Sequence, residues 1–276
     1  MSIALALTLA LAGSGTALTH PQPGDESATA HFLANEAVMV TAGETKILFD
    51  PLFTHSYGYP LVAPDTKARL MAGEGEFAGV DAVLVSHVHG DHFDAPEMNA
   101  YLAAHPEVIL VAPHQARLDM QADAGWQPDF AERMRILPFV AQPQDLVIAA
   151  DGDSAAISIE AVYIPHAGGP GRAHIQNMVY RVTLNGEATV MHLGDATPDP
   201  SAYAPHAGHF QEETTHNAFP PYWLIERWGG DTVRETLNAD HVTGIHVPIN
   251  TPISVRASRE DFFTEAGETR DVHGHE

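Results

Sequence analysis

Short apolar runs separated by glycine, proline and polar residues recur along most of this chain. Runs of this length, rich in β-branched residues and bounded by turn residues, predict buried or half-buried strands. A clear signal for a turn lies between two of them, where Asn185-Gly186 predicts a β-hairpin. The predicted strands lie within residues 36–43, 46–51, 80–86, 108–113, 146–150, 156–165, 177–184, 188–195 and 241–248.

Helical spacing of apolar residues predicts helices over 95–105, 114–122 and 231–238, the first with Pro96 in its first turn and the last beginning at Asp231. Residues 51–79 are rich in proline and glycine and show little periodicity, so we expect a long surface loop there. Strands in meanders with interspersed helices favour a layered α/β sandwich over an alternating parallel sheet. We predict one domain over residues 31–265 and a flexible tail over 266–276.

The amino terminus differs from the rest of the chain. An apolar stretch at 3–12 leads into small residues that end at Ala17, and no Lys or Arg precedes it. This pattern is typical of a secretory signal peptide over residues 1–17, followed by a flexible segment over 18–30. We therefore expect an exported, periplasmic protein. No other stretch is long and apolar enough to predict a membrane span.

The charge balance and the histidine and cysteine content limit the partners and metal ligands that can be expected. The chain has 36 Asp and Glu against 13 Lys and Arg, a formal charge of −23, which argues against a nucleic acid partner and leaves a small-molecule substrate. It has 18 histidines and no cysteine. A metal site in this chain must therefore be built from imidazoles and carboxylates, without thiolates.

The stretch "SHVHGDHF" follows a predicted strand and holds the densest group of such donors. His87 and His89 are two residues apart, so in extended chain their side chains point the same way. Gly90 permits a tight turn, after which Asp91 and His92 follow. Clustered imidazoles are costly to bury without partners, so this segment predicts a metal site at the end of the strand.

His-x-His-x-Asp-His is the signature of the metallo-β-lactamase superfamily, and the chain resembles that family in the order of its further motifs over roughly residues 31–250. The resemblance implies a four-layer αββα sandwich and a centre for two divalent metal ions, most often zinc, with manganese or iron as alternatives. It implies one metal on His87, His89 and His166, another on Asp91, His92 and His246, Asp195 between the two, and Asp50 supporting the metal-binding loop from behind.

Other residues near these motifs are candidates for contact with substrate. We expect Asp91 and His174 to have catalytic roles, and Asn177 and Tyr222 to line the substrate pocket, with the loops 51–79 and 196–225 setting specificity. His192, close to Asp195 in sequence, is expected to pack behind the site and not to bind metal.

The resemblance implies a hydrolase in which a metal-bound hydroxide, with a pKa of about 7, attacks a small β-lactam, lactone or other ester or amide. A phosphodiesterase of the same fold is an alternative. An iron-dependent oxidoreductase of the sulfur dioxygenase type is another, because it keeps the same ligands; the diiron type has Glu where His89 stands. The β-lactamase subclasses with a cysteine ligand are excluded. A non-catalytic metal store is the least favoured reading.

Overall fold

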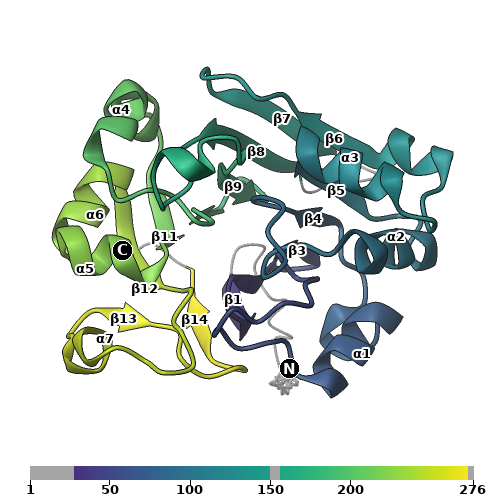
Figure 1. Cartoon of the computed structure of the whole chain (residues 1–276), viewed down its shortest axis with the longest axis horizontal. Helices are drawn as coiled ribbons and strands as arrows, with labels where there is room; N and C mark the ends of the chain where they lie inside the picture. The colour runs from purple at the N-terminus through teal and green to yellow at the C-terminus, as the bar shows by residue number, and fades with distance from the viewer. Residues whose placement is uncertain (1–27, 150–155, 273–276) are drawn as a thin grey trace, which may run out of the picture.

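The structure is a computed structural model that describes residues 28–149 and 156–272 (Figure 1). The predicted signal peptide and the segment 18–27 lie outside the described residues, so export stays a prediction. Among the described residues, every helix is too short or too polar to traverse a lipid bilayer.

The described strands form two seven-stranded sheets. In the first, the order is β14-β1-β2-β3-β4-β5-β6, and in the second it is β13-β12-β11-β10-β9-β8-β7. The first sheet comprises β1 (Thr29–Ala34), β2 (Ala37–Ala42), β3 (Thr45–Phe49), β4 (Ala82–Leu84), β5 (Ile109–Pro113), β6 (Met134–Leu137) and β14 (Thr269–Asp271). The second comprises β7 (Gln144–Ala149), β8 (Ala156–Tyr163), β9 (Met178–Leu184), β10 (Ala188–His192), β11 (Thr215–Phe219), β12 (Ala239–Gly244) and β13 (Asp261–Phe262).

Helices cover the outer face of each sheet and lie on opposite sides of the molecule (Figure 1). Side chains such as Leu48 and Val83 face α1 (Pro64–Ala72), α2 (Ala95–Ala104) and α3 (His114–Ala122) in one apolar cluster. Met191 and Val242 pack in another, beneath α4 (Ala207–Phe210), α5 (Tyr222–Trp228), α6 (Gly230–Leu237) and α7 (Ile253–Ala257). A third cluster lies between the sheets and joins residues of both. The predicted four-layer αββα sandwich is confirmed.

The direction of the strands brings distant segments to one edge. The strands β3 to β6 are parallel, as are β10 to β13, and β8 runs in the direction of β10 because both are antiparallel to β9. The predicted metal ligands lie in the segments that follow β4, β8, β10 and β12. These segments converge because the carboxyl ends of the four strands meet at the same edge of the sandwich.

The hairpin prediction is confirmed, since β9 and β10 pair through a turn in which Asn185 and Gly186 both have positive φ, 59° and 72°. The loop prediction for 51–79 is wrong over its second half, which forms α1 and a 3₁₀ turn at Gly75–Phe77. Buried Leu70 and Phe77 anchor this segment on the first sheet, and Gly73 ends the helix in the left-handed conformation. Packing, more than local periodicity, decides the structure there.

The predicted domain limits also need correction. The flexible segment 18–30 ends too late, because Thr29 and Ala30 already belong to β1. The predicted tail 266–276 contains β14, which pairs with β1, and the backbone N–H of buried Val272 donates to Ala28 O at 2.8 Å. An edge strand leaves backbone groups unpaired, and β14 satisfies those of β1. Residues 273–276 lie outside the described residues.

Candidate metal centre

The loop after β4 places four candidate ligands on one tight turn. The backbone N–H groups of His92 and Phe93 both donate to His89 O at 2.9 Å, which closes the turn around Gly90 and Asp91. The carboxylate of Asp50, at the end of β3, accepts from Ser86 N at 2.7 Å and contacts His92 Nδ1 at 2.8 Å. The loop is therefore fixed at both ends by one buried carboxylate, as the sequence predicted for Asp50.

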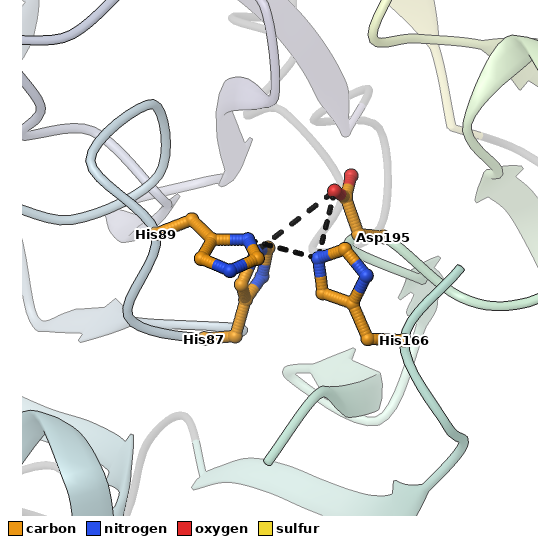
Figure 2. Close-up of side chains that lie close together, drawn as sticks. All are labelled: His87, His89, His166 and Asp195. Carbon is orange, nitrogen blue, oxygen red and sulfur yellow. Dashed lines mark hydrogen bonds and ion pairs between the residues drawn. The ribbon is translucent and has the colours of Figure 1, made fainter. Parts of the chain in front are cut away.

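Four side chains from three separate segments form what we call the first ligand group, namely His87, His89, His166 and Asp195 (Figure 2). His89 Nδ1 lies 3.0 Å from His87 Nε2 and 2.9 Å from His166 Nε2. His166 Nε2 is 3.0 Å from Asp195 Oδ2. All four side chains point toward a common centre.

The second ligand group is made of Asp91, His92 and His246, with the other oxygen of Asp195. His92 Nε2 and His246 Nε2 are 3.3 Å apart. Asp195 Oδ1 lies 2.8 Å from His246 Nε2 and 3.4 Å from His92 Nε2. Asp91 Oδ2 lies 3.7 Å from His246 Nε2 and 3.9 Å from His92 Nε2. One carboxylate therefore faces both groups, with a different oxygen toward each.

The position of Asp195 depends on a close approach of backbone. Gly194 precedes it with φ of 50°, and a Cβ there would lie 2.6 Å from Asn177 Oδ1 and 2.7 Å from Ser86 Cβ. Only glycine fits this conformation and this space. Asp195 N donates to Asn177 Oδ1 at 3.0 Å, so the amide holds the carboxylate's backbone in place.

The electrostatics suit cations. Burial, reinforced by neighbouring imidazoles, lowers the pKa of His87 well below its usual value and that of His89 to about 4. Burial opposes the charge on Asp195, but His246 and His92 outweigh it and hold its pKa well below the ordinary range. Neutral imidazoles and an ionised carboxylate are the protonation states that metal ligands require.

The spacing of the donor atoms in both groups can be compared with the spacing of ligands around a metal ion. Each group presents at least three nitrogen or carboxylate oxygen donors whose atoms lie within 4.8 Å of one another. Neighbouring ligands of a tetrahedral zinc ion are about 3.3 Å apart at the usual bond lengths of about 2.0–2.1 Å. The contacts of 2.8–3.4 Å between His89, His166, His92, His246 and Asp195 are compatible with that spacing. The residues present therefore fit two divalent ions.

Comparisons with known proteins agree with this centre. Residues 29–210 match the family model described as the β-lactamase superfamily domain. That match covers well over half of the chain. The chain belongs to the metallo-β-lactamase superfamily.

Individual relatives are more distant. A segment of 62 residues is 40% identical to a UPF0173 metal-dependent hydrolase of Thermus thermophilus, and it spans only 22% of this chain and 22% of that protein. A metallo hydrolase of the archaeon Ignicoccus hospitalis is similar in structure, with a TM-score of 0.58 and 16% identity, over 90% of this chain and 100% of that one. A variant of CmlA, a β-hydroxylase of Streptomyces venezuelae, gives a TM-score of 0.53 and 16% identity, over 91% and 55%. At such identities the structural likeness shows the fold.

A buried glutamate that sequence reasoning missed lies beside the centre of this superfamily member. Glu36 is fully buried in the turn between β1 and β2, and it groups with Asp195 and His246. His192 Nε2 lies 3.0 Å from Glu36 Oε2, and its ring stacks on Phe49 at 4.8 Å between centroids. Burial alone would lower the pKa of His192, but Glu36 raises it. The one available signal was a charged residue in an otherwise apolar stretch, "LANEAVMV".

The centre opens into a cavity of about 610 Å³. Its walls include His89, Asp91, Asp195 and His246 from the ligand groups, together with Tyr57, Tyr59, Ala167, Gly168, Arg172 and Trp223. The Trp223 indole N–H donates to Ala196 O at 3.0 Å, which fixes this side chain beside the His246 ring. The loops that carry these walls include the predicted specificity segments.

Three predicted contact residues are corrected. His174 is exposed and absent from the cavity walls, because the turn at Pro170–Arg172 brings Arg172 there in its place. Asn177 is fully buried, and its amide N–H donates to Ile164 O and Leu193 O, so it ties strand ends together behind Asp195. Tyr222 packs with the apolar cluster under α5, whereas its neighbour Trp223 lines the cavity.

Proposed function

We propose that the protein is a hydrolase that uses two divalent metal ions, zinc in the first instance, to cleave a small carbonyl substrate such as a β-lactam, a lactone or another ester or amide. The observation that carries the proposal is the placement of Asp195, with one oxygen toward each ligand group. A carboxylate shared in this way is typical of paired metal sites that act on one bond.

Bound ions of this kind lower the pKa of water and polarise a carbonyl oxygen. Asp91 contributes to the second ligand group and also lines the cavity, so we assign its carboxylate the role of orienting water and accepting its proton. Its catalytic role is thus retained in the proposal, without His174.

The phenol O–H of Tyr59 offers a hydrogen-bond donor in the wall of the same cavity. Its ring contacts that of His246, with centroids 3.8 Å apart, and it lines the cavity. Burial, with the charge of Asp195 nearby, raises the pKa of Tyr59 above its ordinary value. The phenol therefore stays protonated at neutral pH, and we propose that it donates to the oxygen on which negative charge develops.

A second candidate is an iron-dependent oxidoreductase, favoured by the chemistry of the donor set. Imidazole and carboxylate ligands suit iron as well as zinc. The likeness in fold to the CmlA β-hydroxylase is compatible with this candidate but carries no ligand chemistry of its own. Metal content and turnover must be measured together to separate the two.

The test uses purified protein loaded separately with zinc, manganese or iron. A chromogenic cephalosporin, a lactone, a 4-nitrophenyl ester and bis(4-nitrophenyl) phosphate are offered to the wild type and to Asp91→Asn. We expect turnover of one or more carbonyl substrates by the zinc or manganese forms, weak or absent phosphodiester cleavage, and a loss of activity in the variant. Absence of hydrolysis by every form, with oxygen consumption by the iron form alone, would overturn the proposal in favour of the oxidoreductase.

A further inference from the structure

Arg172 is the one Lys or Arg among the ten residues that line the metal cavity. Basic residues are rare in this chain, 13 in number against 36 acidic ones. Arg172 follows the ligand His166 by six residues, at the end of the turn Pro170–Arg172. A cation at this place is therefore a distinctive feature of the cavity wall.

The side chain of Arg172 lies across Gly168, another residue of the wall. A Cβ at Gly168 would lie 3.0 Å from Arg172 Cδ, 3.2 Å from its Nε and 3.5 Å from its Cζ. Gly168 has φ of 99°, which favours glycine, and the missing Cβ leaves room for the Arg172 side chain. The guanidinium lies near enough to the first ligand group to be the smallest of the contributions to the lowered pKa of His89, after burial, His166 and His92.

No hydrogen bond or ion pair ties the guanidinium of Arg172 to another side chain of the described residues. By contrast, several other arginines pair with carboxylates at 2.6–3.2 Å, namely Arg69, Arg234 and Arg270. In so acidic a protein, an arginine beside the metal centre that has no carboxylate partner among residues 28–149 and 156–272 can offer its donors to a ligand. Arginine presents a planar fork of donors that matches a carboxylate in two parallel hydrogen bonds.

Three aromatic residues also line the cavity. Tyr57, Tyr59 and Trp223 contribute ring surface, and Trp223 and Gly168 also border a neighbouring cavity of about 840 Å³. A substrate can therefore extend past the metal centre along the rings. One cation beside three aromatic rings favours a substrate with a single negative charge and an aliphatic or aromatic body.

We propose that Arg172 binds a carboxylate on the substrate, so that the preferred substrates are carboxylate-bearing esters, amides or lactones. The inference rests on the proposed hydrolase function and specifies its substrate class. Arg172 is a specificity-determining residue that stays outside both ligand groups.

The test compares two closely similar substrates, the 4-nitrophenyl hydrogen glutarate monoanion and its methyl ester, which is larger by one methyl group. They are offered to zinc-loaded wild type, Arg172→Gln and Arg172→Lys. The control is Arg256→Gln, which makes the same charge change on exposed α7 outside the two cavities. The measured quantity is the ratio of kcat/KM for the anionic over the neutral substrate.

We expect Arg172→Gln to lower that ratio by about 10- to 100-fold, the usual effect of losing a charge-assisted contact. The loss should come through KM, since the contact is made equally in the ground state and the transition state. Arg172→Lys should recover part of it, and Arg256→Gln should leave it unchanged. An unchanged ratio in Arg172→Gln, with both substrates still hydrolysed, would overturn the inference and leave the hydrolase proposal standing. Failure of the wild type to hydrolyse either substrate would overturn both.

Discussion

The two ligand groups of the metal centre differ in charge although they share Asp195. The first group adds three imidazoles to that carboxylate, and the pKa values of His87 and His89 are lowered, so both rings are neutral. The second group adds Asp91, and the Asp50 carboxylate lies directly behind His92. There, burial would lower the pKa of His92, but Asp195 and Asp50 outweigh it and raise the value well above normal.

The two ligand groups would therefore bind the proposed ions under different electrostatic conditions. Neutral imidazoles bind the first ion without losing a proton, so that group is ready for metal at neutral pH. In the second group, the raised pKa of His92 favours its protonated form, so metal binding there is expected to compete with a proton. Removal of a carboxylate should therefore disturb the second ion more, unless the carboxylate is the shared one.

The largest effect is expected from Asp195→Asn, because this substitution changes a ligand of both groups at once. The amide keeps the shape of the side chain but removes the negative charge and offers a single ligand oxygen. We expect the metal content to fall from two ions to less than one per chain, with turnover lower by more than about 100-fold. Elemental analysis after dialysis, with circular dichroism as a check of folding, measures this. Two retained ions would contradict the shared role.

Asp91→Asn should separate the groups. Asp91 contacts only His92 and His246 among the ligands, so we expect one ion per chain to remain on the first group while turnover falls roughly 100-fold. The fold should survive, because the bond from Asn35 reaches the backbone oxygen of Asp91, which the change leaves in place.

The matched variant for the first group is His89→Ala, in which the second ion should be retained. His89 is half-exposed, so its removal should cost little folding free energy. Metal counts for both variants, taken under the same dialysis, show whether each group binds on its own. Loss of both ions in each variant would mean that the groups form only as a unit.

The smallest effect is expected from Asp50→Asn, which leaves every ligand of both groups in place and changes only the carboxylate behind His92. Asp50 bonds the far side of the His92 ring, and loss of such a carboxylate typically weakens metal binding by about 10- to 100-fold. We expect the second ion to weaken more than the first in a zinc titration with a competing chelator. Asp81→Asn is the control, since its carboxylate bonds Lys46 N and lies away from both groups. Equal weakening of both ions would show that Asp50 only supports the loop as a whole.

The resemblance to the family implied the candidate ligands, and each of them follows a strand whose apolar pattern is evident in the sequence. His166, Asp195 and His246 occur after such strands in a fixed order, and the fold brings their ends to one edge. The cavity walls could not be predicted in this way. Their side chains belong to turns where a shift of two residues, from His174 to Arg172, exchanges an exposed side chain for a wall residue.

Some of the fold also depends on partners distant in sequence. The strand Thr269–Asp271 has no apolar pattern and forms because β1 leaves an edge to pair with. Glu36 gave only a weak signal, since its burial depends on His192 from the other sheet. Local pattern predicts elements that bury their own apolar faces, whereas contacts between sheets decide the remainder.

The most direct test of the paired centre is anomalous diffraction from crystals of the zinc-loaded protein, recorded above and below the zinc absorption edge. The account predicts two peaks about 3.5–4 Å apart, one among His87, His89 and His166 and one among Asp91, His92 and His246, with a different oxygen of Asp195 toward each. A single peak, or a peak that Asp195 does not contact, would contradict it.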